Sequence, residues 1–358
     1  MASACGFRRV RFVLACRIVP RRRRRLEGHA FGLVAACSLL AAPVGAASRT
    51  GRVSSRVRLP PVIVPASASG WDVAVGQACR RALGGAQGAV VAMDPRTGRV
   101  NAVINPTLAL HRAYQPCSVF KIVVAVAGLS EGLITPETTY RCRKGCWMWA
   151  GHGPIDLRRA LAVSCNPYFE WVGEQLGYET LRRYARLLGL GEPSGINLTG
   201  ETGGRVPGSV SDLVVGHLSS HAEGIAASAV QLAVLLSATI NGGIVFQPQV
   251  SGPEAFSARE RWRLPEGTRL DGLADGFLGA VNEGSATAAF DPEVVVAGKT
   301  GTCSRLGWFA SYAPADRPEL AVVVFLRRGS GHNASAVAGR IYRELYLPGP
   351  AATAAGQP

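Results

Sequence analysis

Apolar residues recur along the first part of the chain with two different periods. Residues 71–83 carry apolar side chains every three or four positions, which predicts an amphipathic helix. Residues 89–93 and 99–104 are short apolar segments separated by a turn that contains Pro95 and Gly98. This pattern is typical of two strands joined by a turn. The body of the protein is therefore expected to begin with one helix and two strands.

The spacing of apolar residues is helical from residue 116 to about residue 241. Helices are expected over residues 118–131, 157–163, 168–175, 180–188 and 226–240. Strands are expected again at 294–297, 308–312 and 320–326, followed by an amphipathic helix at 337–347. Residues 246–285 show no clear period. The order of elements predicts an α/β protein with an antiparallel sheet flanked by helices and an inserted all-helical subdomain.

The helix expected at 118–131 is apolar on nearly every side, which predicts a buried helix. It nevertheless carries Ser118 in its first turn and Lys121 three residues later, on the same helix face. Burial favours the neutral amine of a lysine, and a neutral amine beside a hydroxyl is a general base beside a nucleophile. The alternative is that Lys121 extends from an ordinary core helix to the surface.

The use of basic residues favours the catalytic interpretation. The chain has 39 lysines and arginines, but the only lysines are Lys121, Lys144 and Lys299. Arginine serves wherever a plain positive charge is sufficient, and arginine does not deprotonate in proteins whereas lysine can. The positions kept as lysine are therefore informative.

The net charge of +15 is concentrated near the N-terminus, and the 300 residues after position 58 are nearly neutral. No basic patch with interleaved aromatic residues is present in the sequence, which argues against nucleic-acid binding. Hydrophobic residues make up 47% of the chain, enough for a sizeable globular core.

Residues 1–47 have the order of a secretory signal. A basic block at 21–25 precedes an uncharged apolar segment at 31–46, which ends in small residues. We expect residues 1–47 to be a signal peptide or an N-terminal membrane anchor, and the protein to lie in the periplasm or cell envelope. The Ser-, Arg- and Pro-rich residues 48–70 are expected to form a linker, and residues 348–358 a disordered tail.

Six cysteines follow the N-terminal segment. Exported chains can form disulfides, and Cys142 and Cys146 are close enough in sequence to pair. Cys117, Cys165 and Cys303 are expected to be small packing residues. A zinc site at Cys142 and Cys146 would need two more ligands, which the spacing of the sequence does not indicate. His217 and His221 have metal-ligand spacing without an acidic partner between them. We therefore expect neither a metal nor a cofactor.

Two further short motifs follow Ser118-Val119-Phe120-Lys121 along the chain. Ser164-Cys165-Asn166 lies between two expected helices, and Lys299-Thr300-Gly301 ends an expected strand. Each motif alone is consistent with a helix cap, a turn or a strand end. Together and in this order, S-x-x-K, S-x-N and K-T-G are the signature of penicillin-recognising serine acyltransferases.

Over residues 71–347 the sequence resembles the transpeptidase domain of penicillin-binding proteins. Further segments that are similar to this family include 88–98, 114–116, 131–136, 151–153 and 307–310. The resemblance implies an α/β part formed by residues 71–116 and 294–347 and a helical part formed by residues 117–245. It also implies an active site in the cleft between these two parts.

The resemblance assigns a role to each motif residue. Ser118 is expected to attack the carbonyl of a D-alanyl-D-alanine peptide bond and Lys121 to accept its proton. Ser164 is expected to pass a proton to the leaving nitrogen, and Asn166 to hydrogen-bond the acyl-chain amide.

The K-T-G segment is expected to bind the end of the substrate. Lys299 is expected to supply a positive charge for the terminal carboxylate, assisted by the hydroxyls of Thr300 and Thr302, while Gly301 leaves room for substrate along the strand. The oxyanion is expected between the backbone N–H groups of Ser118 and Thr302.

These roles imply a D,D-transpeptidase or D,D-carboxypeptidase that acts on peptidoglycan stem peptides in cross-linking or trimming. They also imply β-lactams as covalent inhibitors and cell-wall synthesis proteins as partners.

One alternative is a class D-like serine β-lactamase, although Ser164-Cys165-Asn166 does not fit that class and no deacylating base is visible. A second is a non-enzymatic β-lactam sensor domain, which would need several membrane spans. A third is a degenerate domain that only binds wall-synthesis partners, against which the intact motifs argue.

Overall fold

The structure is a computed structural model. The structure describes residues 59–347 except residues 67, 144, 145, 147, 149 and 251–255. The signal or anchor expected at 1–47 and the tail expected at 348–358 lie outside the described residues. None of the described helices is long and apolar enough to cross a membrane.

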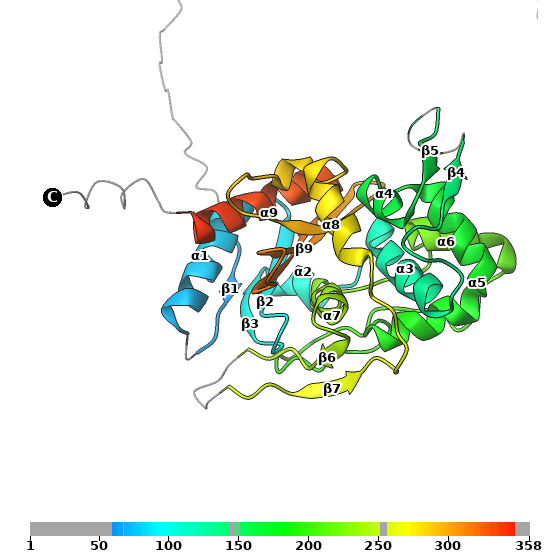
Figure 1. Cartoon of the computed structure of the whole chain (residues 1–358). Helices are drawn as coiled ribbons and strands as arrows, with labels where there is room; N and C mark the ends of the chain where they lie inside the picture. Colours follow the sequence, from blue (N-terminus) through cyan, green and yellow to red (C-terminus); the bar gives the residue numbers. More distant parts are fainter. Residues whose placement is uncertain are drawn as a thin grey trace, which may run out of the picture. The chain divides into compact units, whose positions relative to one another are not determined.

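A six-stranded antiparallel sheet is the centre of the fold, with strand order β1-β3-β2-β10-β9-β8 (Figure 1). Its strands are β1 (Val62–Ile63), β2 (Gly88–Met93), β3 (Val100–Ile104), β8 (Ala297–Cys303), β9 (Leu306–Ala313) and β10 (Leu320–Leu326). Strands far apart in sequence are neighbours, because β10 pairs with β2 in register Val323↔Val91. Strand β8 lies at one edge of the sheet.

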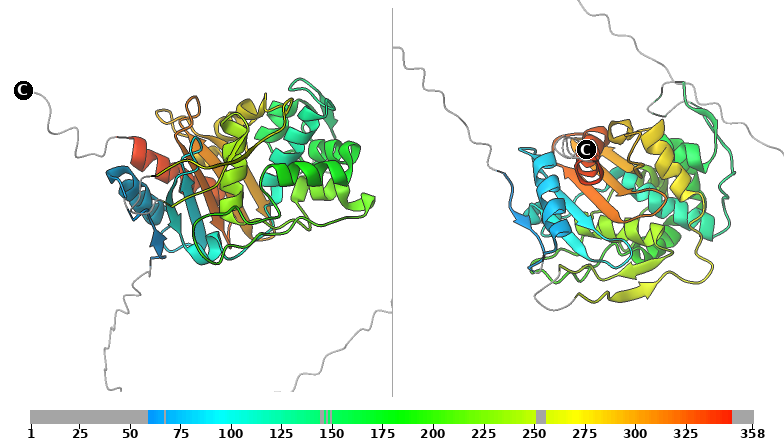
Figure 2. Two further views of the ribbon diagram at one scale, coloured as in Figure 1. Left: turned by 90° about the horizontal axis from the view of Figure 1, so that it is seen from below. Right: turned by 60° about the vertical axis from the view of Figure 1, so that its left-hand side comes forward.

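Both faces of the sheet are covered, which explains why its central strands read as continuous apolar segments. Along β10, Val323 faces one core cluster while Val322 and Val324 face the other. Helices α1 (Gly70–Leu83) and α9 (Gly331–Tyr346) pack on one face, and α7 (Ala229–Ile240) packs on the opposite face. Figure 2 shows the sheet between α9 and the helices of the central part of the chain.

The helical part is built around the buried helix that begins at Lys121. It contains α3 (Lys121–Ser130), α4 (Leu157–Ala162), α5 (Asn166–Leu187) and α6 (Val215–His221). The two-stranded sheet of β4 (Tyr140–Cys142) and β5 (Gly153–Ile155) packs on these helices. The short helix α2 (Pro106–Ala109) contacts β2, β3 and α7, and the two-stranded sheet of β6 (Ile244–Phe246) and β7 (Glu260–Arg263) contacts α7. The α/β fold with an antiparallel sheet and an inserted helical region is thus confirmed.

Several boundaries differ from the expectations. Strand β8 spans Ala297–Cys303, so it begins later than the strand expected at 294–297 and contains the whole K-T-G motif. The two helices expected at 168–175 and 180–188 belong to α5, which is interrupted only at Gly177 (φ 73°). Residues 215–221, which the sequence analysis did not place in a helix, form α6, and α8 (Leu273–Asn282) lies in the stretch without a clear period. Val62 and Ile63, within the expected linker, pair with β3.

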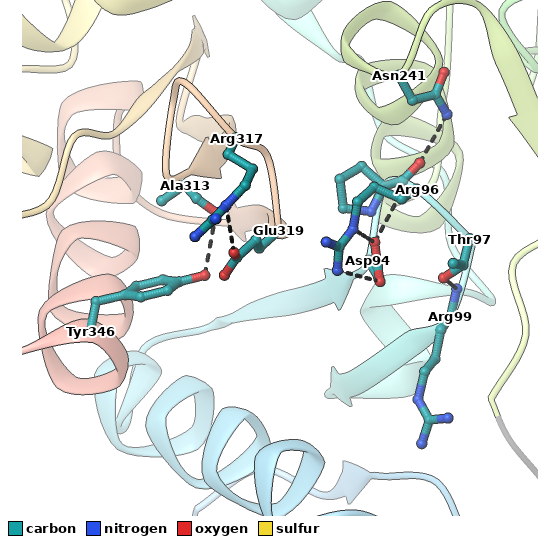
Figure 3. Close-up of polar contacts among 10 residues, drawn as sticks. Asp94, Arg96, Thr97, Arg99, Asn241, Ala313, Arg317, Glu319 and Tyr346 are labelled. Atoms are coloured by element: carbon teal, nitrogen blue, oxygen red, sulfur yellow. Dashed lines mark hydrogen bonds and ion pairs between the residues drawn. The ribbon is translucent and has the colours of Figure 1, made fainter.

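Polar contacts fix the β2–β3 turn and tie it to the end of α7 (Figure 3). The Asp94 carboxylate accepts hydrogen bonds from the Arg96 backbone N–H at 2.9 Å and from the Arg96 guanidinium at 3.0 Å, which fixes the turn. The Asn241 side chain, at the end of α7, donates to the Pro95 carbonyl at 2.9 Å. The same view shows a contact between the ends of α9 and β9, where the Tyr346 hydroxyl donates to the Ala313 carbonyl at 3.3 Å.

Candidate active site

Ser118 lies in a single 3₁₀ turn, Cys117–Phe120, that leads directly into α3. Cys117 has a positive φ of 54°, a conformation that non-glycine residues rarely adopt and that occurs most often at functional sites. The Ser118 hydroxyl donates to the Ser220 carbonyl at 3.3 Å. The local backbone therefore places the serine hydroxyl at the start of a buried helix, where it lines a cleft.

Lys121 is fully buried and its ammonium is held by three acceptors. Its Nζ donates to Asn166 Oδ1 at 2.6 Å, to the Ser164 carbonyl at 2.8 Å and to Ser164 Oγ at 3.2 Å. Burial lowers the pKa of Lys121 from its ordinary value of 10.5 to about 7. A substantial fraction of the amine is therefore neutral near neutral pH, as a general base requires.

Ser164 stands in the turn between α4 and α5 with a positive φ of 56°. Its Oγ lies between two lysines, 3.2 Å from Lys121 Nζ and 2.9 Å from Lys299 Nζ. A hydroxyl can accept one proton while it donates another. Ser164 therefore joins the two lysines in one hydrogen-bonded chain that can move a proton across the cleft.

Lys299 is also fully buried, and its Nζ donates to the Ser164 hydroxyl and to the Thr300 carbonyl, each at 2.9 Å. Burial, followed by the nearby charge of Lys121, holds the pKa of Lys299 well below its ordinary value. An anion in the cleft would oppose both effects and favour the charged form. Lys299 is therefore suited to bind a carboxylate.

The other residues of β8 contact the cleft in different ways. The Thr300 hydroxyl lies 2.6 Å from the Ser285 hydroxyl, and Thr302 Oγ1 accepts a hydrogen bond from the Gly331 N–H at 2.8 Å. Since a hydroxyl has one proton to donate, Thr302 can still donate to a bound group. A Cβ on Gly301 would lie 2.6 Å from the Pro116 carbonyl oxygen, so this glycine allows β8 to pack against the segment before Ser118.

The cleft beside Ser118 has a volume of about 410 Å³ and is lined by residues from distant parts of the chain. It is lined by Ser118, Val163, Ser164, Asn166, His221, Ser285, Thr300 and Thr302. A larger cavity, of about 770 Å³, lies between α5 and β7 and contains none of the motif residues. The smaller cleft is therefore the candidate functional site because of the residues that line it, and not because of its volume.

His221 is a cleft residue that the sequence analysis considered only as a metal ligand. Its Nε2 lies 3.3 Å from the Asn166 side-chain amide, and its Nδ1 lies 2.6 Å from the Ser220 hydroxyl. Burial, followed by the charges of His217 and Lys121, lowers its pKa. A neutral imidazole can accept a hydrogen bond from Asn166 and so orient it. The serines at 220 and 285 were also missed, because no motif includes them.

The disulfide differs from the expected one. Cys117 and Cys303, expected to be packing residues, are bonded to each other across 186 positions. Cys142 and Cys146, expected to pair, are both free thiols. The disulfide joins the residue before Ser118 to the residue after Thr302. The spacing of cysteines in the sequence carries no information on this pair, because the two segments meet only in the folded chain.

Residues that could hold a metal lie beside the cleft, contrary to the expectation from spacing. The ligand atoms of Cys142, Cys146, His152 and Cys165 all lie within 4.8 Å of one another. Three thiols and an imidazole form a donor set that fits zinc. The sequence analysis recognised only the first two members. The other two are brought in by the β4–β5 hairpin and by the turn between α4 and α5.

The lowered pKa of Lys121 predicts a pH dependence of acylation. Below pH 7 the amine is protonated and cannot accept the Ser118 proton, so the acylation rate should rise as the pH passes through about 7 and then level off. Rates of labelling by a fluorescent penicillin, measured from pH 5.5 to 8.5 with probe hydrolysis as control, provide the test. A flat profile would show that the proton acceptor is another group.

The sheet, the inserted helices, the hydrogen-bonded Lys121, Ser164 and Lys299, and Ser118 lining the same cleft together define a penicillin-recognising serine enzyme fold. The comparison with protein families specifies this further: residues 88–347 match the penicillin binding protein transpeptidase domain. The chain belongs to this family.

Curated relatives carry names consistent with the family. The chain is 25% identical to peptidoglycan D,D-transpeptidase MrdA of Acinetobacter baumannii, over 71% of this chain and 49% of the relative. It is 27% identical to stage V sporulation protein D of Bacillus subtilis, over 67% and 45%. It is 26% identical to peptidoglycan D,D-transpeptidase PbpA of Mycobacterium tuberculosis, over 78% and 70%. The chain spans about half the length of the first two relatives.

Solved structures show the same fold. Penicillin-binding protein A from M. tuberculosis, as an imipenem acyl-enzyme complex, matches with a TM-score of 0.67 and 22% identity over 76% of this chain and 78% of that one. Penicillin-binding protein PBP2 of Helicobacter pylori, in complex with MreC, matches with a TM-score of 0.67 and 19% identity over 76% and 62%.

Proposed function

We propose that this chain is a D,D-acyltransferase that acts on D-alanyl-D-alanine stem peptides of peptidoglycan through an acyl-enzyme at Ser118. The observation that carries the proposal is the continuous hydrogen-bonded chain from Lys121 through Ser164 to Lys299 beside the nucleophile. Names of the relatives support the same chemistry, since two of those described above are peptidoglycan D,D-transpeptidases.

Acylation would begin with proton transfer from Ser118 to the neutral amine of Lys121. The serine oxygen forms a bond to the carbonyl carbon, and the carbonyl oxygen becomes an oxyanion, which the backbone N–H groups of Ser118 and Thr302 stabilise. The carbon–nitrogen bond then breaks. The leaving amine takes a proton from Ser164, which is replenished from the protonated Lys121 at 3.2 Å.

Substrate binding would use the remaining cleft residues. The terminal carboxylate pairs with Lys299 and accepts a hydrogen bond from Thr302, while Thr300 lines the same end of the cleft. Asn166, which contacts Lys121 and His221, would hydrogen-bond the acyl-chain amide. An amine that accepts the acyl group gives transpeptidation, and water gives carboxypeptidation.

Labelling with penicillin tests this function. The complete acylation machinery and the absence of an evident deacylating base in the sequence predict that fluorescent penicillin acylates Ser118 and remains bound for at least many minutes. Ser118→Ala should not be labelled. Peptide mass spectrometry should place the adduct on Ser118, and release of label should be followed for hours.

Other outcomes of this experiment would favour the alternatives. Rapid turnover of a chromogenic cephalosporin would indicate a class D-like β-lactamase. Stable labelling without product formation from a D-alanyl-D-alanine donor peptide, with or without an added acceptor amine, would indicate a sensor or a binding domain. Release of D-alanine would confirm the D,D-acyltransferase.

Cell-wall synthesis proteins are the proposed partners. The support is the similar fold of H. pylori PBP2, which was solved in complex with MreC. Cross-linking in intact cells, followed by purification of this chain, should recover envelope proteins of wall synthesis. Recovery of the chain alone under conditions that preserve such complexes would contradict the proposal.

An exported location is proposed because peptidoglycan stem peptides are cross-linked outside the cytoplasmic membrane and the relatives are cell-wall enzymes. The basic block and apolar segment within residues 1–47 are expected to direct export. Fusion of residues 1–60 to a reporter that is active only in the periplasm should give activity. Replacement of the arginines at 21–25 by glutamine should reduce it, and a cytoplasmic reporter would refute the export signal.

A further inference from the structure

Helices α5 and α6 are joined beside the cleft by hydrogen bonds between four side chains. Asn166 and Glu170 are four positions apart on α5, so their side chains lie on one face of that helix. Ser220 and His221 end α6, which packs against α5 (Figure 1). The Ser220 hydroxyl donates to Glu170 Oε1 at 2.8 Å, and its oxygen lies 2.6 Å from His221 Nδ1. His221 Nε2 lies 3.3 Å from the Asn166 side-chain nitrogen, so the contacts begin and end on α5.

Ser220 determines which nitrogen of His221 carries the proton. A hydroxyl has one proton to donate, and a carboxylate only accepts. The Ser220 proton therefore goes to Glu170, or to the His217 carbonyl at 3.2 Å, which is also an acceptor. In either case only the Ser220 oxygen faces Nδ1. Nδ1 must then donate, so the neutral imidazole carries its proton on Nδ1 and leaves Nε2 as an acceptor.

His221 Nε2 in turn determines which way the Asn166 amide points. An acceptor at Nε2 faces the NH₂ group of Asn166 and not its carbonyl oxygen. The Oδ1 atom therefore lies on the other side of the amide, where it accepts a hydrogen bond from Lys121 Nζ at 2.6 Å. If the amide were reversed, its carbonyl oxygen would face the Nε2 lone pair, and two acceptors would meet without a proton between them.

The direction of the Asn166 amide matters because a neutral amine has two N–H groups and one lone pair. The carbonyl oxygens of the Asn166 side chain and the Ser164 backbone lie 2.6 and 2.8 Å from Lys121 Nζ, and both can only accept. They take the two N–H groups of the neutral amine. The lone pair is left for a hydroxyl proton in the cleft, where Ser164 Oγ lies 3.2 Å away. With a reversed amide, an N–H group of Asn166 would bind the lone pair and hinder proton transfer.

We propose that His221 is a positioning residue for acylation, an inference that rests on the proposed function. It directs the Asn166 carbonyl to Lys121 and so keeps the lone pair of the neutral amine free to accept a proton. Ser220 and Glu170 fix the tautomer of His221. The imidazole takes no proton from the substrate in this scheme, and its effect reaches the reaction through Asn166.

Protonation of His221 would reverse this arrangement. An imidazolium donates from both nitrogens, so Nε2 would face the Asn166 carbonyl and turn the N–H groups of the amide toward Lys121. His217 stacks on the imidazole with 4.2 Å between the ring centroids. The charged groups around the imidazole come from α3, α5, α6 and the segment after α6: Lys121, Glu170, His217 and Glu223. Burial, followed by the charges of His217 and Lys121, lowers the pKa of His221 from its ordinary value of 6.5, so the reversed form is expected only at acidic pH.

Substitution of His221 tests the role through acylation. His221→Ala removes the acceptor, and we expect the acylation rate constant for fluorescent penicillin to fall about 10-fold at about pH 8, the usual effect of losing one hydrogen bond. His221→Gln offers an acceptor oxygen in place of Nε2 and should recover most of the rate. The matched control is His217→Gln on the same helix, whose native side chain contacts Glu223, and it should react like wild type. Melting temperatures show whether each variant is folded.

The pH profile is a readout that a purely structural role would not change. In wild type both Lys121 and His221 must be neutral, so the logarithm of the acylation rate constant should rise with a slope approaching about 2 per pH unit at the acid end. His221→Gln has no titrating group at this position and should rise with a slope of about 1. Circular dichroism at each pH confirms that the proteins compared are folded.

A double-mutant cycle tests whether His221 acts through Asn166. Asn166→Ala removes the amide that His221 orients, and the two side chains are in contact, so their effects should not add. In the Asn166→Ala background, His221→Ala should change the acylation rate constant by less than about 2-fold. A further loss of about 10-fold in that background would show that His221 acts by another route, and it would overturn the proposal.

The outcomes separate this inference from the proposed function. Failure of penicillin to label wild type would refute the function itself. Labelling of wild type, with equal acylation rate constants for wild type and folded His221→Ala, would refute the positioning role and leave the function intact. The same conclusion would follow from a His221→Gln variant that is as slow as His221→Ala, or from one that keeps the steep acid limb of wild type.

Discussion

Lys121→Arg should lower the rate of Ser118 acylation by about 10²–10⁴-fold, the usual contribution of a general base. Lys121 must lose its proton to act, and arginine does not do so near neutral pH. Lys299→Arg should cause a smaller loss, because Lys299 needs only to carry a positive charge and donate to a carboxylate. The second-order rate of labelling by fluorescent penicillin measures both effects.

The two substitutions form a matched pair. Both lysines are fully buried and both donate to the same Ser164 hydroxyl, so each replacement adds similar bulk to the same cluster. The difference between them then reports on deprotonation rather than on packing. The assignment of roles is wrong if Lys121→Arg is labelled as fast as wild type, or if Lys299→Arg is the more damaged variant on folded protein.

Ser164→Ala should lower the acylation rate by about 10²-fold through loss of the proton relay. The hydroxyl is the atom that joins Lys121 to Lys299, and no other described side chain hydrogen-bonds both lysines. Without it, the proton accepted by Lys121 has no short path to the leaving nitrogen. Single-turnover acylation rates at saturating penicillin should show the loss directly.

A second serine substitution provides the control. Ser237 is buried in α7, away from the cleft, and its hydroxyl has no hydrogen-bond partner. Ser237→Ala therefore removes a buried serine oxygen without breaking a bond, and it should leave both the melting temperature and the acylation rate nearly unchanged. Equal rates for Ser164→Ala and wild type would exclude Ser164 as the proton relay.

The pattern of apolar residues predicted most of the fold, because burial determines which positions of each helix and strand must be apolar. Val322 and Val324 face one core cluster and Val323 the other, so a strand covered on both faces must be apolar throughout, and this is visible in the sequence. The start of α6 was not visible, since Val214 precedes it without a side-chain cap. The sequence analysis placed a boundary between two helices near Gly177. A glycine interrupts the apolar pattern whether the helix ends there or continues beyond it.

Only the residues of the candidate site that belong to a sequence motif could be predicted. The S-x-x-K, S-x-N and K-T-G residues that line the cleft were expected from their order in the chain. His221 and Ser285 enter the cleft through long-range packing, for which the sequence has no signal. The Cys117–Cys303 disulfide and the cluster around Cys165 likewise depend on which loops meet, and local spacing favoured a pair that the fold does not form.

The position of β8 at the edge of the sheet has a consequence for association between molecules. An edge strand offers unpaired backbone groups to any extended chain, including the edge of another copy of the same protein. Here the exposed stretch is short, because residues of the turn before α3 and of α8 pack against β8. Residues 297–301 of β8 are buried, and only Thr302 is exposed. The packing that shapes the cleft therefore also leaves little of β8 open to pairing with the edge of another copy of the protein.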